Sequence, residues 1–496
     1  MLPVDGSLLC HDLPSRPRPE IGRILVTGAT GYIGGRLVPE LLARGYRVRV
    51  MVRAPSDEYR NRWPGAQVVV ADALNAGSLC EALHGIHAAY YLIHSLLLGQ
   101  GEFEAKEIQA AENFRTAAEK EGVAHIIYLG ALGDIRVPLS PHLRSRIRVA
   151  EELGRGRVAT TVLRAAIIIG SGSASYEIIE HLVRNLPVFF VPRWAETRCQ
   201  PIAIRDVIKY LVGVLETPEA CGRSLDIGGH DVLTYRQMLS IFANVLGKRR
   251  LFLPCPFCNI GLFSYFASLV TPVPAAITRC LMEGIASEVV CQSQDIQRLL
   301  PFQPSGYREA IVRALSREEQ DRVHTRWSDA YPPAHELAIK LHELKEPVHY
   351  TSSDSLLTEK DASALFRSIC RIGGKEGWFY SNWMWRLRGM IDRILLGVGS
   401  SRGRRSSSSL RAGDVIDFWR VEDLQQDAML LLRAEMKLPG MAWLQFNVDR
   451  KDGGHQLSVN AYYQPSGVLG TLYWYACLPF HSLIFRNLIR QIEKRA

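Results

Sequence analysis

The sequence Ile24-Leu-Val-Thr-Gly-Ala-Thr-Gly-Tyr-Ile-Gly-Gly35 predicts how the first half of the chain folds. Residues 24–26 form an apolar run that is typical of a buried parallel strand, and residues 36–42 have the composition of a helix. The strand and the helix are separated by a turn that contains Gly28, Gly31 and Gly34. This order is typical of a dinucleotide-binding site, because the N–H groups at the start of the helix attract a pyrophosphate.

The three glycines have different roles in such a turn. Gly28 permits the tight turn, Gly31 lets a pyrophosphate approach the backbone, and Gly34 lets the helix pack closely on the strand. The alternative is an ordinary glycine-rich turn, because a glycine triplet alone is a weak signal. The strand before the glycines and the helix after them favour the cofactor site.

Length and composition indicate an ordinary globular protein. The chain has 496 residues, of which 47% are hydrophobic and 22% charged, and this length corresponds to about two to four domains. The arginines behind the net charge of +9 are scattered, so we expect a solvated basic surface and no nucleic-acid partner. Ten cysteines do not indicate a disulfide scaffold, and the lone Cys255-Pro-Phe-Cys258 lacks further ligands, so we predict no metal site.

The chain divides by pattern into a tail and a first domain. Residues 1–20 contain four prolines and no signal-peptide core, so we expect a disordered tail and a cytoplasmic protein. Residues 21–169 alternate strand-like and helix-like segments, which predicts an α/β fold with a doubly wound parallel sheet. Residues 170–325 are expected to complete this domain as an extension over the carboxyl ends of the strands, where such a sheet binds its ligands.

After a proline-containing segment, residues 326–350, which we predict to be a linker, the pattern changes. Apolar and polar residues alternate in the segments 432–438, 442–448 and 457–463, which is typical of antiparallel strands that are covered on one side only. Residues 351–496 are therefore predicted to form an α+β domain, with the helix after Leu469 filling the concave side of the sheet. The Ser- and Arg-rich residues 400–411 are expected to be a mobile loop, with phosphate or membrane contact as the alternative.

Two long uncharged stretches, residues 251–278 and 468–485, raise the question of a membrane. The first is interrupted by four prolines, and the second has almost the length of a membrane span but contains Pro479 and runs into basic residues. We expect buried helices in both. The alternative is peripheral membrane contact, above all by the second stretch.

Strand two predicts the type of cofactor. An Asp or Glu about 20 residues after the glycine turn usually binds the ribose, but Arg53 stands at this place, with Arg49 nearby. A guanidinium can hold a 2′-phosphate with two hydrogen bonds, so we favour NADP(H) over NAD(H); the alternative is a solvated strand end. Asp72 is expected to bind the adenine amino group or to cap a helix, and His94 to line the path of the ribose and nicotinamide or to be structural. The residues expected to contact the cofactor are Gly28, Thr30, Gly31, Tyr32, Ile33, Gly34, Arg53, Asp72 and His94.

The turn Thr27-Gly-Ala-Thr-Gly-Tyr-Ile-Gly34 resembles the cofactor turn of the atypical and extended short-chain dehydrogenases, including the NmrA-like group. Further similarity to one bacterial atypical subgroup lies in Ala71-Asp72, in residues 163–173, 192–194 and 200–206, and in residues 351–496, which resemble the C-terminal domain of unknown function of that subgroup. The resemblance implies an NAD(P)-binding Rossmann fold and an oxidoreductase. The pattern of residues 351–496 is also similar to the helix-grip fold of START and polyketide-cyclase-like proteins, which hold apolar ligands.

The chain departs from that family at the expected proton donor. Short-chain dehydrogenases use a Tyr general acid with a Lys four residues later, and no Tyr-x-x-x-Lys occurs in this chain. The resemblance places His142 at the Tyr position and Arg146 at the Lys position. A histidine can donate a proton near neutral pH, and Arg146 could hold a ribose or a phosphate. Three alternatives stay open: His142 is the acid, the site uses another donor, or the site binds cofactor without turnover.

These observations predict an NADP(H)-dependent oxidoreductase that acts on a small or lipophilic substrate, with hydride moving between the nicotinamide and a carbonyl or an activated alkene. The alternatives are a non-catalytic NADP(H) sensor or scaffold and a membrane-surface protein of lipid or quinone metabolism.

Overall fold

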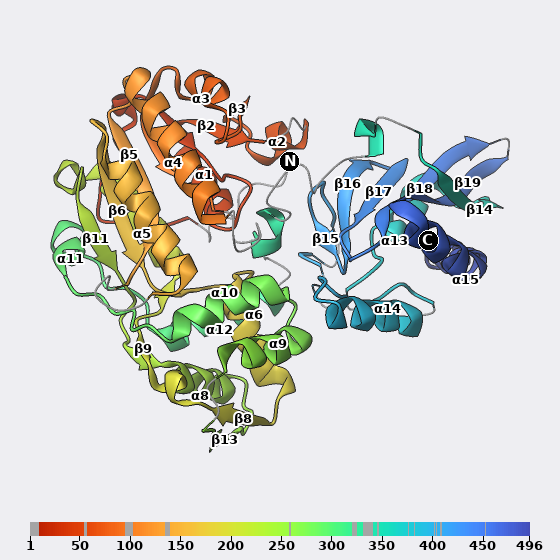
Figure 1. The fold of residues 1–496 in the computed structure, drawn as a ribbon. Coiled ribbons are helices and arrows are strands. Elements are labelled where there is room, and N and C mark those ends of the chain that lie inside the picture. The colour runs from red at the N-terminus through yellow and green to blue at the C-terminus, as the bar shows by residue number, and fades with distance from the viewer. Residues whose placement is uncertain are drawn as a thin grey trace. The chain divides into compact units, whose positions relative to one another are not determined.

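The computed structural model of the chain forms two compact units (Figure 1). The first contains Met1–Val270 and Ala276–His335, and the second contains Thr271–Ala275 and Glu336–Ala496. The residues that the structure describes are 9–53, 57–94, 103–133, 139–256, 259–319, 325–330, 341–344, 347–374, 376–380, 382–400, 402, 404–406, 409–451 and 453–496. Cys258 of the cysteine pair lies outside these ranges, and within them no group of three His, Cys, Asp or Glu side chains is arranged to hold a metal ion.

A parallel sheet of seven strands forms the centre of the first unit, in the order β11-β6-β5-β4-β1-β2-β3. The strands are β1 (Arg23–Val26), β2 (Arg47–Val52), β3 (Gln67–Val70), β4 (Ile86–Tyr91), β5 (His125–Ala131), β6 (Ala159–Ala165) and β11 (Ser224–Ile227). One face packs against α1 (Gly34–Ala43) and α7 (Ile204–Glu216), and the other against α3 (Ala76–Leu83), α4 (Phe103–Lys120) and α5 (Pro141–Gly154). The predicted doubly wound α/β fold is confirmed.

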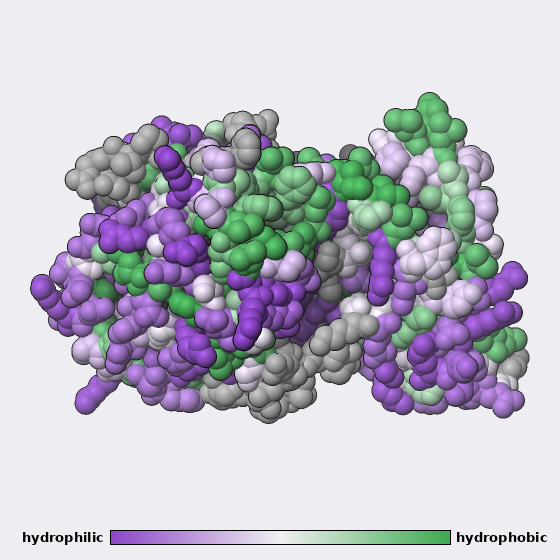
Figure 2. Space-filling model, turned by 90° about the horizontal axis from the view of Figure 1, so that it is seen from below, coloured by the Kyte–Doolittle hydropathy of each residue, from purple (hydrophilic) through white to green (hydrophobic). Residues whose placement is uncertain are grey.

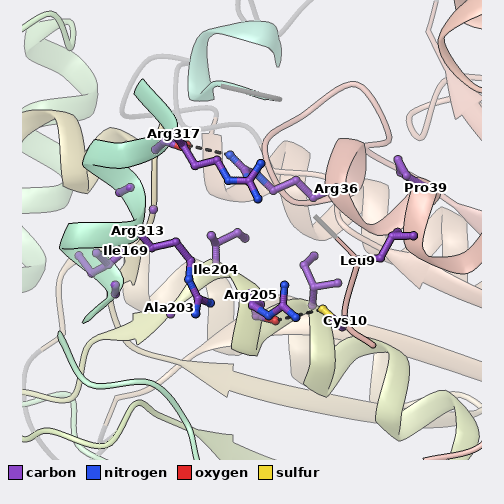
Figure 3. Close-up of a pocket in the computed structure, with 15 residues that line it drawn as sticks. Leu9, Cys10, Arg36, Pro39, Ile169, Ala203, Ile204, Arg205, Arg313 and Arg317 are labelled. Atoms are coloured by element: carbon purple, nitrogen blue, oxygen red, sulfur yellow. Dashed lines mark hydrogen bonds between the residues drawn. The ribbon is translucent and has the colours of Figure 1, made fainter. Parts of the chain in front are cut away.

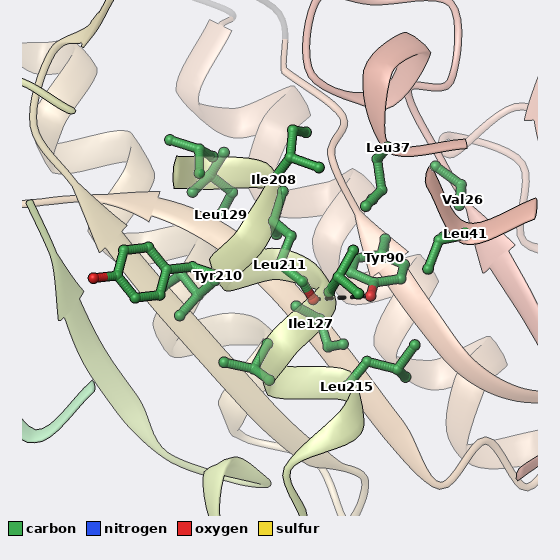
Figure 4. Close-up of a cluster of buried hydrophobic side chains, with 14 of the residues drawn as sticks. Val26, Leu37, Leu41, Tyr90, Ile127, Leu129, Ile208, Tyr210, Leu211 and Leu215 are labelled. Carbon is green, nitrogen blue, oxygen red and sulfur yellow. Dashed lines mark hydrogen bonds between the residues drawn. The ribbon is translucent and has the colours of Figure 1, made fainter. Parts of the chain in front are cut away.

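The apolar run at the start of the glycine motif is buried on both faces of the sheet. Ile24 and Val26 belong to the core beneath α1 and α7, and Leu25 belongs to the core beneath α4 and α5. All three side chains have 0% exposure, which is why this strand shows no alternation of polar and apolar residues. In the first core, shown in Figure 4, Tyr90 donates a hydrogen bond from its hydroxyl to the carbonyl of Leu211 (2.9 Å), so its polar atom is satisfied.

Residues after β6 form the expected extension. Its helices are α6 (Ala174–Asn185), α8 (Tyr235–Val245), α9 (Ile260–Val270), α10 (Ala275–Ile285), α11 (Asp295–Leu299) and α12 (Tyr307–Glu319). It also contains three sheets of two strands each. These sheets pair β7 (Ile168–Ile169) with β10 (Ile202–Ala203), β8 (Val188–Val191) with β13 (Leu251–Pro254), and β9 (Arg198–Cys199) with β12 (Leu233–Thr234). Thr234 caps α8 in a capping box with Gln237.

The predicted disordered tail is wrong for residues 9–20, because this segment packs on the first unit. The backbone N–H of Cys10 donates to Glu40 Oε2 (2.9 Å), and Asp12 lies 2.6 Å from the ammonium of Lys209. Part of the predicted linker also packs there, since Trp327 donates from its indole to Glu177 Oε2 (2.7 Å). The predictions of a tail and a linker rested on composition, above all on proline content. Composition does not reveal partners that are distant in the sequence.

The second unit contains an antiparallel sheet of six strands in the order β14-β19-β18-β17-β16-β15. These strands are β14 (Tyr350–Thr358), β15 (Val415–Ile416), β16 (Trp419–Gln425), β17 (Met429–Ala434), β18 (Gly440–Lys451) and β19 (Gly454–Pro465), and the helices are α13 (Ala362–Ile369), α14 (Asn382–Ile394) and α15 (Gly467–Arg495). The predicted separate α+β domain is confirmed. Helix α15 packs against β14 and β19, but the prediction that residues 468–485 form a buried helix is wrong, because most apolar side chains of α15 before Phe485 are exposed. The buried apolar side chains are Trp474, Phe485 and, beyond the predicted stretch, Leu488, Ile489 and Ile492.

The Ser- and Arg-rich segment differs from the expected mobile loop. Arg402 is 3% exposed and lies 2.7 Å from Glu435 Oε2, and Arg405 lies 2.8 and 2.9 Å from the two carboxylate oxygens of Asp414. These arginines therefore neutralise buried carboxylates within the second unit. Residues 401, 403, 407 and 408 of this segment lie outside the described ranges.

Candidate functional site

The glycine turn has the geometry that the sequence predicts. Gly28 adopts the left-handed conformation with φ +59°, and a Cβ atom there would lie 2.5 Å from the carbonyl oxygen of Leu92. The same segment after β4 is tied to the turn, because Leu92 N–H donates to Thr27 Oγ1 (2.9 Å). Any side chain at Gly28 would be strained by the backbone and blocked by Leu92. A Cβ at Gly34 would collide with the carbonyl of Gly28, so Gly34 lets α1 begin directly against the turn.

The start of α1 is left available to a ligand. Ile33 occupies the N-cap position and provides no side-chain hydrogen bond, so the first turn of the helix lacks the usual polar cap. The N–H groups of Gly35 and Arg36 donate to the carbonyls of Gly31 and Ile33 (3.0 Å each), so an anion at this position would be attracted mainly by the positive end of the helix dipole. Tyr32 turns away toward the extension, where its carbonyl accepts a hydrogen bond from Thr325 Oγ1 (2.9 Å). The residues of the turn thus fit a bound pyrophosphate.

Of the two arginines on strand two, only one remains a candidate for the cofactor. Arg49 is buried and donates to Gln67 Oε1 (3.0 Å), Ala82 O (2.7 Å) and His84 O (2.9 Å), so it is structural. Arg53 is exposed and directly follows β2. Because β2 pairs in parallel with β1, Arg53 stands at the same edge of the sheet as the glycine turn.

Asp72 follows β3 at this edge. Its Oδ1 accepts a hydrogen bond from the N–H of Leu74 (3.0 Å), which makes a local turn, and the cap of α3 is Asn75, whose Oδ1 accepts from Ser78 N–H (3.2 Å). The alternative role of Asp72 as a helix cap is therefore wrong, and the prediction that it contacts adenine stays a prediction.

A buried polar cluster occupies the neighbouring end of the sheet, past β4 and β5. His94 Nδ1 lies 2.9 Å from Glu107 Oε1 on α4, and Ser145 on α5 donates a short hydrogen bond to Glu107 Oε2. Burial opposes the charge on Glu107, but His94, Arg146 and Ser145 together lower the pKa of its carboxyl to about 2. The Glu107 carboxylate therefore stays ionised and holds His94 and α5 in place.

His142 joins this cluster through its ring, whose centroid lies 5.0 Å from that of His94. Its Nδ1 is fully buried and has no hydrogen-bond partner among the described residues. Burial holds the pKa of His142 well below its usual value, and His94 and Arg146 lower it further. This imidazole is therefore neutral at neutral pH, and the surroundings oppose the imidazolium that a histidine general acid needs.

The resemblance places Arg146 at the Lys position of short-chain dehydrogenases, but part of its guanidinium group is used within the fold. Its Nη1 donates to the carbonyl of Leu129 on β5 (3.0 Å), so one nitrogen is committed to the sheet. Arg146 also lines a cavity of about 550 Å³ at the ends of β5, β6 and β11. On the other side of this cavity, Arg164 lies 2.6 Å from Asp226. The cavity is large enough for a small organic molecule and has charged walls.

One end of helix α10 lies beside the start of α5, near this cluster. A Cβ at Gly284 would lie 3.9 Å from Ser140 Oγ, just before α5. The Cys280 thiol faces the same region, since Glu283 and Glu107 add to burial in raising its pKa to about 12. A thiol with this pKa is protonated and is no nucleophile at neutral pH.

Another cavity of the first unit, shown in Figure 3, lies at the outer side of α1. The side chains of Arg36, Arg205, Arg313 and Arg317 surround it. Arg36 donates to the carbonyl of Ser171 (2.8 Å), and Arg205 pairs with Asp12 (2.9 Å). The cavity has a volume of about 70 Å³, which is space for only a few water molecules. It is therefore too small for a dinucleotide.

Two site residues, Glu107 and Ser145, were missed by the sequence analysis. Glu107 stands four residues from Phe103 and four from Ala111, in the apolar stripe of α4. A buried carboxylate needs a hydrogen-bonding or charged partner. The position of Glu107 could therefore have predicted a buried polar contact. Ser145 had no comparable signal, because a serine on a helix is most often solvated.

Comparison with known proteins agrees with this geometry. Residues 20–260 match the NmrA-like family, and residues 345–488 match a family described as a protein of unknown function (DUF2867). A chloroplastic divinyl chlorophyllide a 8-vinyl-reductase from Zea mays is 28% identical over 251 residues, which are 47% of this chain and 61% of the reductase. A 3-beta-hydroxysteroid dehydrogenase from Mycolicibacterium neoaurum is 30% identical over 120 residues, which are 22% of this chain and 32% of the dehydrogenase. The chain thus spans less than two thirds of these relatives.

Solved structures are similar to the chain at lower identity. A nucleoside-diphosphate-sugar epimerase from Staphylococcus aureus is 19% identical and covers 58% of this chain and 99% of its own, with a TM-score of 0.49. A UDP-glucuronic acid 4-epimerase from Bacillus cereus, in complex with UDP-glucuronic acid and NAD, is 18% identical and covers 60% and 99%, with a TM-score of 0.46.

The family matches and the parallel sheet support an NAD(P)-binding fold of the NmrA-like, short-chain dehydrogenase type for the first unit. The relatives are a reductase and a dehydrogenase by name.

Proposed function

We propose that the protein is an NADP(H)-dependent oxidoreductase that reduces a small, lipophilic substrate. The observation that carries this proposal is the conformation of Gly28 against Leu92, next to the uncapped start of α1. The order of the strands supports the rest of the site. The chain leaves β1 toward β2 and β3 on one side and toward β4, β5 and β6 on the other, and ligands of such sheets bind at this switch point.

From this topology we infer that different residues hold the two halves of the cofactor. Arg53 and Asp72 follow β2 and β3 and would hold the adenosine half, with Arg53 at a 2′-phosphate. His94 and His142 follow β4 and β5 and would line the nicotinamide half. The preference for NADP(H) over NAD(H) rests on Arg53 alone, because Arg49 is used structurally.

The cofactor supplies hydride, and the protein residues decide which acceptor can use it. Reduction of a carbonyl leaves an alkoxide that needs a proton donor beside the oxygen. The neutral, buried His142 is a poor donor of this kind. Reduction of a conjugated alkene spreads the charge over the conjugated group and accepts a proton from water. The site therefore favours an activated alkene, and the similarity to 8-vinyl-reductases agrees with this choice.

The test is oxidation of NADPH by the full chain with a panel of conjugated enones, quinones and saturated aldehydes. We expect turnover with conjugated acceptors and at least tenfold less with saturated aldehydes. Turnover of the aldehydes alone would contradict the proposed reaction, and a His142→Ala variant with unchanged turnover would remove His142 from any catalytic role.

A second candidate function is a non-catalytic NADP(H) sensor. The absence of Tyr-x-x-x-Lys and the lowered pKa of His142 favour it. Binding of NADPH without turnover of any acceptor in the panel is the result that this candidate predicts.

For the second unit we propose a role in holding an apolar ligand, as in helix-grip proteins. What supports it is the antiparallel sheet with a long helix, α15, packed against β14 and β19. Release of a bound lipid or hydrophobic metabolite on denaturing the purified full chain, detected by mass spectrometry, would test this role.

A further inference from the structure

Helix α14 of the second unit has its polar and apolar faces reversed. Apolar side chains repeat along one face and are exposed to 65, 44, 54, 44 and 54%: Trp383, Leu387, Met390, Ile391 and Ile394. The opposite face buries Asp392 at 0% and Arg393 at 7% exposure. A helix that met only water on its outer face would carry the opposite pattern. Exposed apolar surface of this extent marks an interaction site.

The buried polar face fixes the orientation of α14. Asp392 accepts hydrogen bonds from the N–H groups of Lys437 (2.7 Å) and Gly399 (2.8 Å) through its two oxygens. Rotating the helix to bury Leu387 and Ile391 would break both hydrogen bonds and remove the Asp392 carboxylate from its two donors. These two hydrogen bonds therefore keep the apolar face of α14 on the outside.

Helix α15 continues this surface. Its outward stripe begins with apolar residues that are exposed to 76, 60, 58 and 53%, namely Val468, Leu472, Tyr475 and Leu483. At helical spacing the same stripe then becomes basic and consists of Arg486, Arg490 and Lys494. The exposed face thus combines apolar side chains that can enter the acyl region of a bilayer with cationic side chains that can meet anionic headgroups.

The two helices are linked within the second unit, because the guanidinium of Arg388 on α14 lies 6.0 Å from the ring centroid of Tyr473 on α15. Figure 2 shows hydrophobic surface along the upper part of the right-hand body, which is the second unit, and hydrophilic surface below it. Residues 467–485 contain no Asp or Glu, and the only acid of α14 is the buried Asp392. The exposed charged side chains that these two helices carry beside the surface are therefore basic, and one of them, Arg486, lies 3.8 Å from Asp354 on β14.

We propose that the exposed faces of α14 (residues 383–394) and α15 (residues 468–483), here called the α14–α15 surface, seat the second unit on an anionic phospholipid bilayer. The basic stripe of α15 complements anionic headgroups, and Trp383 and Tyr475 are suited to the boundary between headgroups and acyl chains. A second copy of the chain fits less well as the partner, because its own basic side chains would repel those of the first copy. This proposal does not depend on the proposed reaction.

The protein lies on the bilayer and does not span it. Among the described helices, α15 alone has the length and apolar composition of a membrane span. However, its inner face is occupied by protein, because the Trp474 ring stacks on Tyr463 (5.6 Å, 8°) and on Tyr350 (5.4 Å, 14°). A helix packed on its own sheet in this way cannot be surrounded by lipid, so it inserts only its outer face.

Flotation of the full chain with phosphatidylcholine vesicles, with or without 30% phosphatidylglycerol, tests the proposal. We expect flotation with the anionic vesicles, and at least a tenfold lower partition coefficient for Leu387→Asp combined with Ile391→Asp, and likewise for Leu472→Asp. Replacing Arg486 and Arg490 with Gln should weaken binding to the anionic vesicles and reduce its dependence on salt. Leu357→Asp is the matched control, because Leu357 is 72% exposed on β14 of the same unit, and it should bind like the unaltered chain. Circular dichroism of every variant establishes that the fold is retained.

Several results would overturn the proposal. One is the absence of flotation with anionic vesicles, and another is an equal loss of binding in the Leu357→Asp control. Resistance of the bound protein to alkaline carbonate would mean that α15 spans the bilayer. A dimer that the same aspartate substitutions dissociate, without any vesicle binding, would assign the surface to a second copy.

Discussion

His94 Nδ1 lies 2.9 Å from Glu107 Oε1, and this contact joins the segment after β4 to α4. The carboxylate of Glu107 also holds Ser145 of α5, so one buried acid fixes three elements around the site. The pKa of Glu107, about 2, shows that the carboxylate is stabilised in its charged form.

Glu107→Gln removes this charge and keeps the size of the side chain. We expect the free energy of unfolding to fall by about 1–3 kcal/mol, because His94 and Ser145 lose a charged partner. Urea unfolding measures this change. Glu112→Gln, at an exposed position of the same helix, is the control and should stay within about 0.5 kcal/mol of the unaltered chain. Equal effects of the two substitutions would contradict the role of Glu107.

Gly28→Ala tests the glycine turn. The substitution adds left-handed backbone strain and places a methyl group against Leu92 O. Gly45→Ala adds similar strain at φ +84° but has no atom within 4 Å of the new methyl group. Fluorescence titration with NADPH should show at least tenfold weaker binding for Gly28→Ala and unchanged binding for Gly45→Ala. Similar affinities of the two variants would disprove the assignment.

Arg53→Ala tests the choice of cofactor. We expect at least tenfold weaker binding of NADPH and little change for NADH, because only NADPH offers a 2′-phosphate to the guanidinium. Arg49→Ala should act differently: it should lower the free energy of unfolding by about 2 kcal/mol through lost buried hydrogen bonds and keep the ratio of the two affinities. The Arg53 hypothesis fails if its removal leaves that ratio unchanged.

The stability of the protein should fall as the pH is lowered from 7.5 to 5, in part through His125. Burial lowers the pKa of His125 to about 4, against an ordinary value of 6.5. The Thr161 hydroxyl donates to Ala220 O (2.8 Å), so it accepts the proton of His125 Nε2 (2.8 Å). A histidine with a lowered pKa stabilises the fold fully above pH 6.5 and progressively less below it.

At pH 5 this one group should cost about 2 kcal/mol of unfolding free energy relative to pH 7.5. Urea unfolding at the two values of pH measures the difference. In His125→Gln the pH dependence over this range should be smaller by that amount, whatever the absolute stability of the variant. An unchanged pH dependence would mean that His125 does not titrate as its burial implies.

Local features of the sequence predicted the cofactor turn and the topology well. The conformation of Gly28 and the close packing at Gly34 follow from residues within one short segment, and strands with both faces buried have a recognisable apolar run. The alternating segments 442–448 and 457–463 likewise lie within β18 and β19, whereas 432–438 overlaps β17 only at residues 432–434.

Features that depend on distant partners could not be predicted in this way. The Arg402–Glu435 pair joins residues 33 positions apart, and the contact of Cys10 with Glu40 joins the N-terminal segment to α1. The lowered pKa of His142 is a further example, because it arises from burial and from Arg146 and His94, whose approach depends on the packing of α5 beside β4 and β5.

The most direct test of the central claim is an equilibrium titration of the full chain with NADPH and NADH, followed by fluorescence of the reduced nicotinamide. We predict saturable binding of both at one site, at least tenfold tighter for NADPH, and loss of this binding in Gly28→Ala. No saturable binding of either nucleotide, or binding that Gly28→Ala leaves intact, would contradict a cofactor site at the glycine turn.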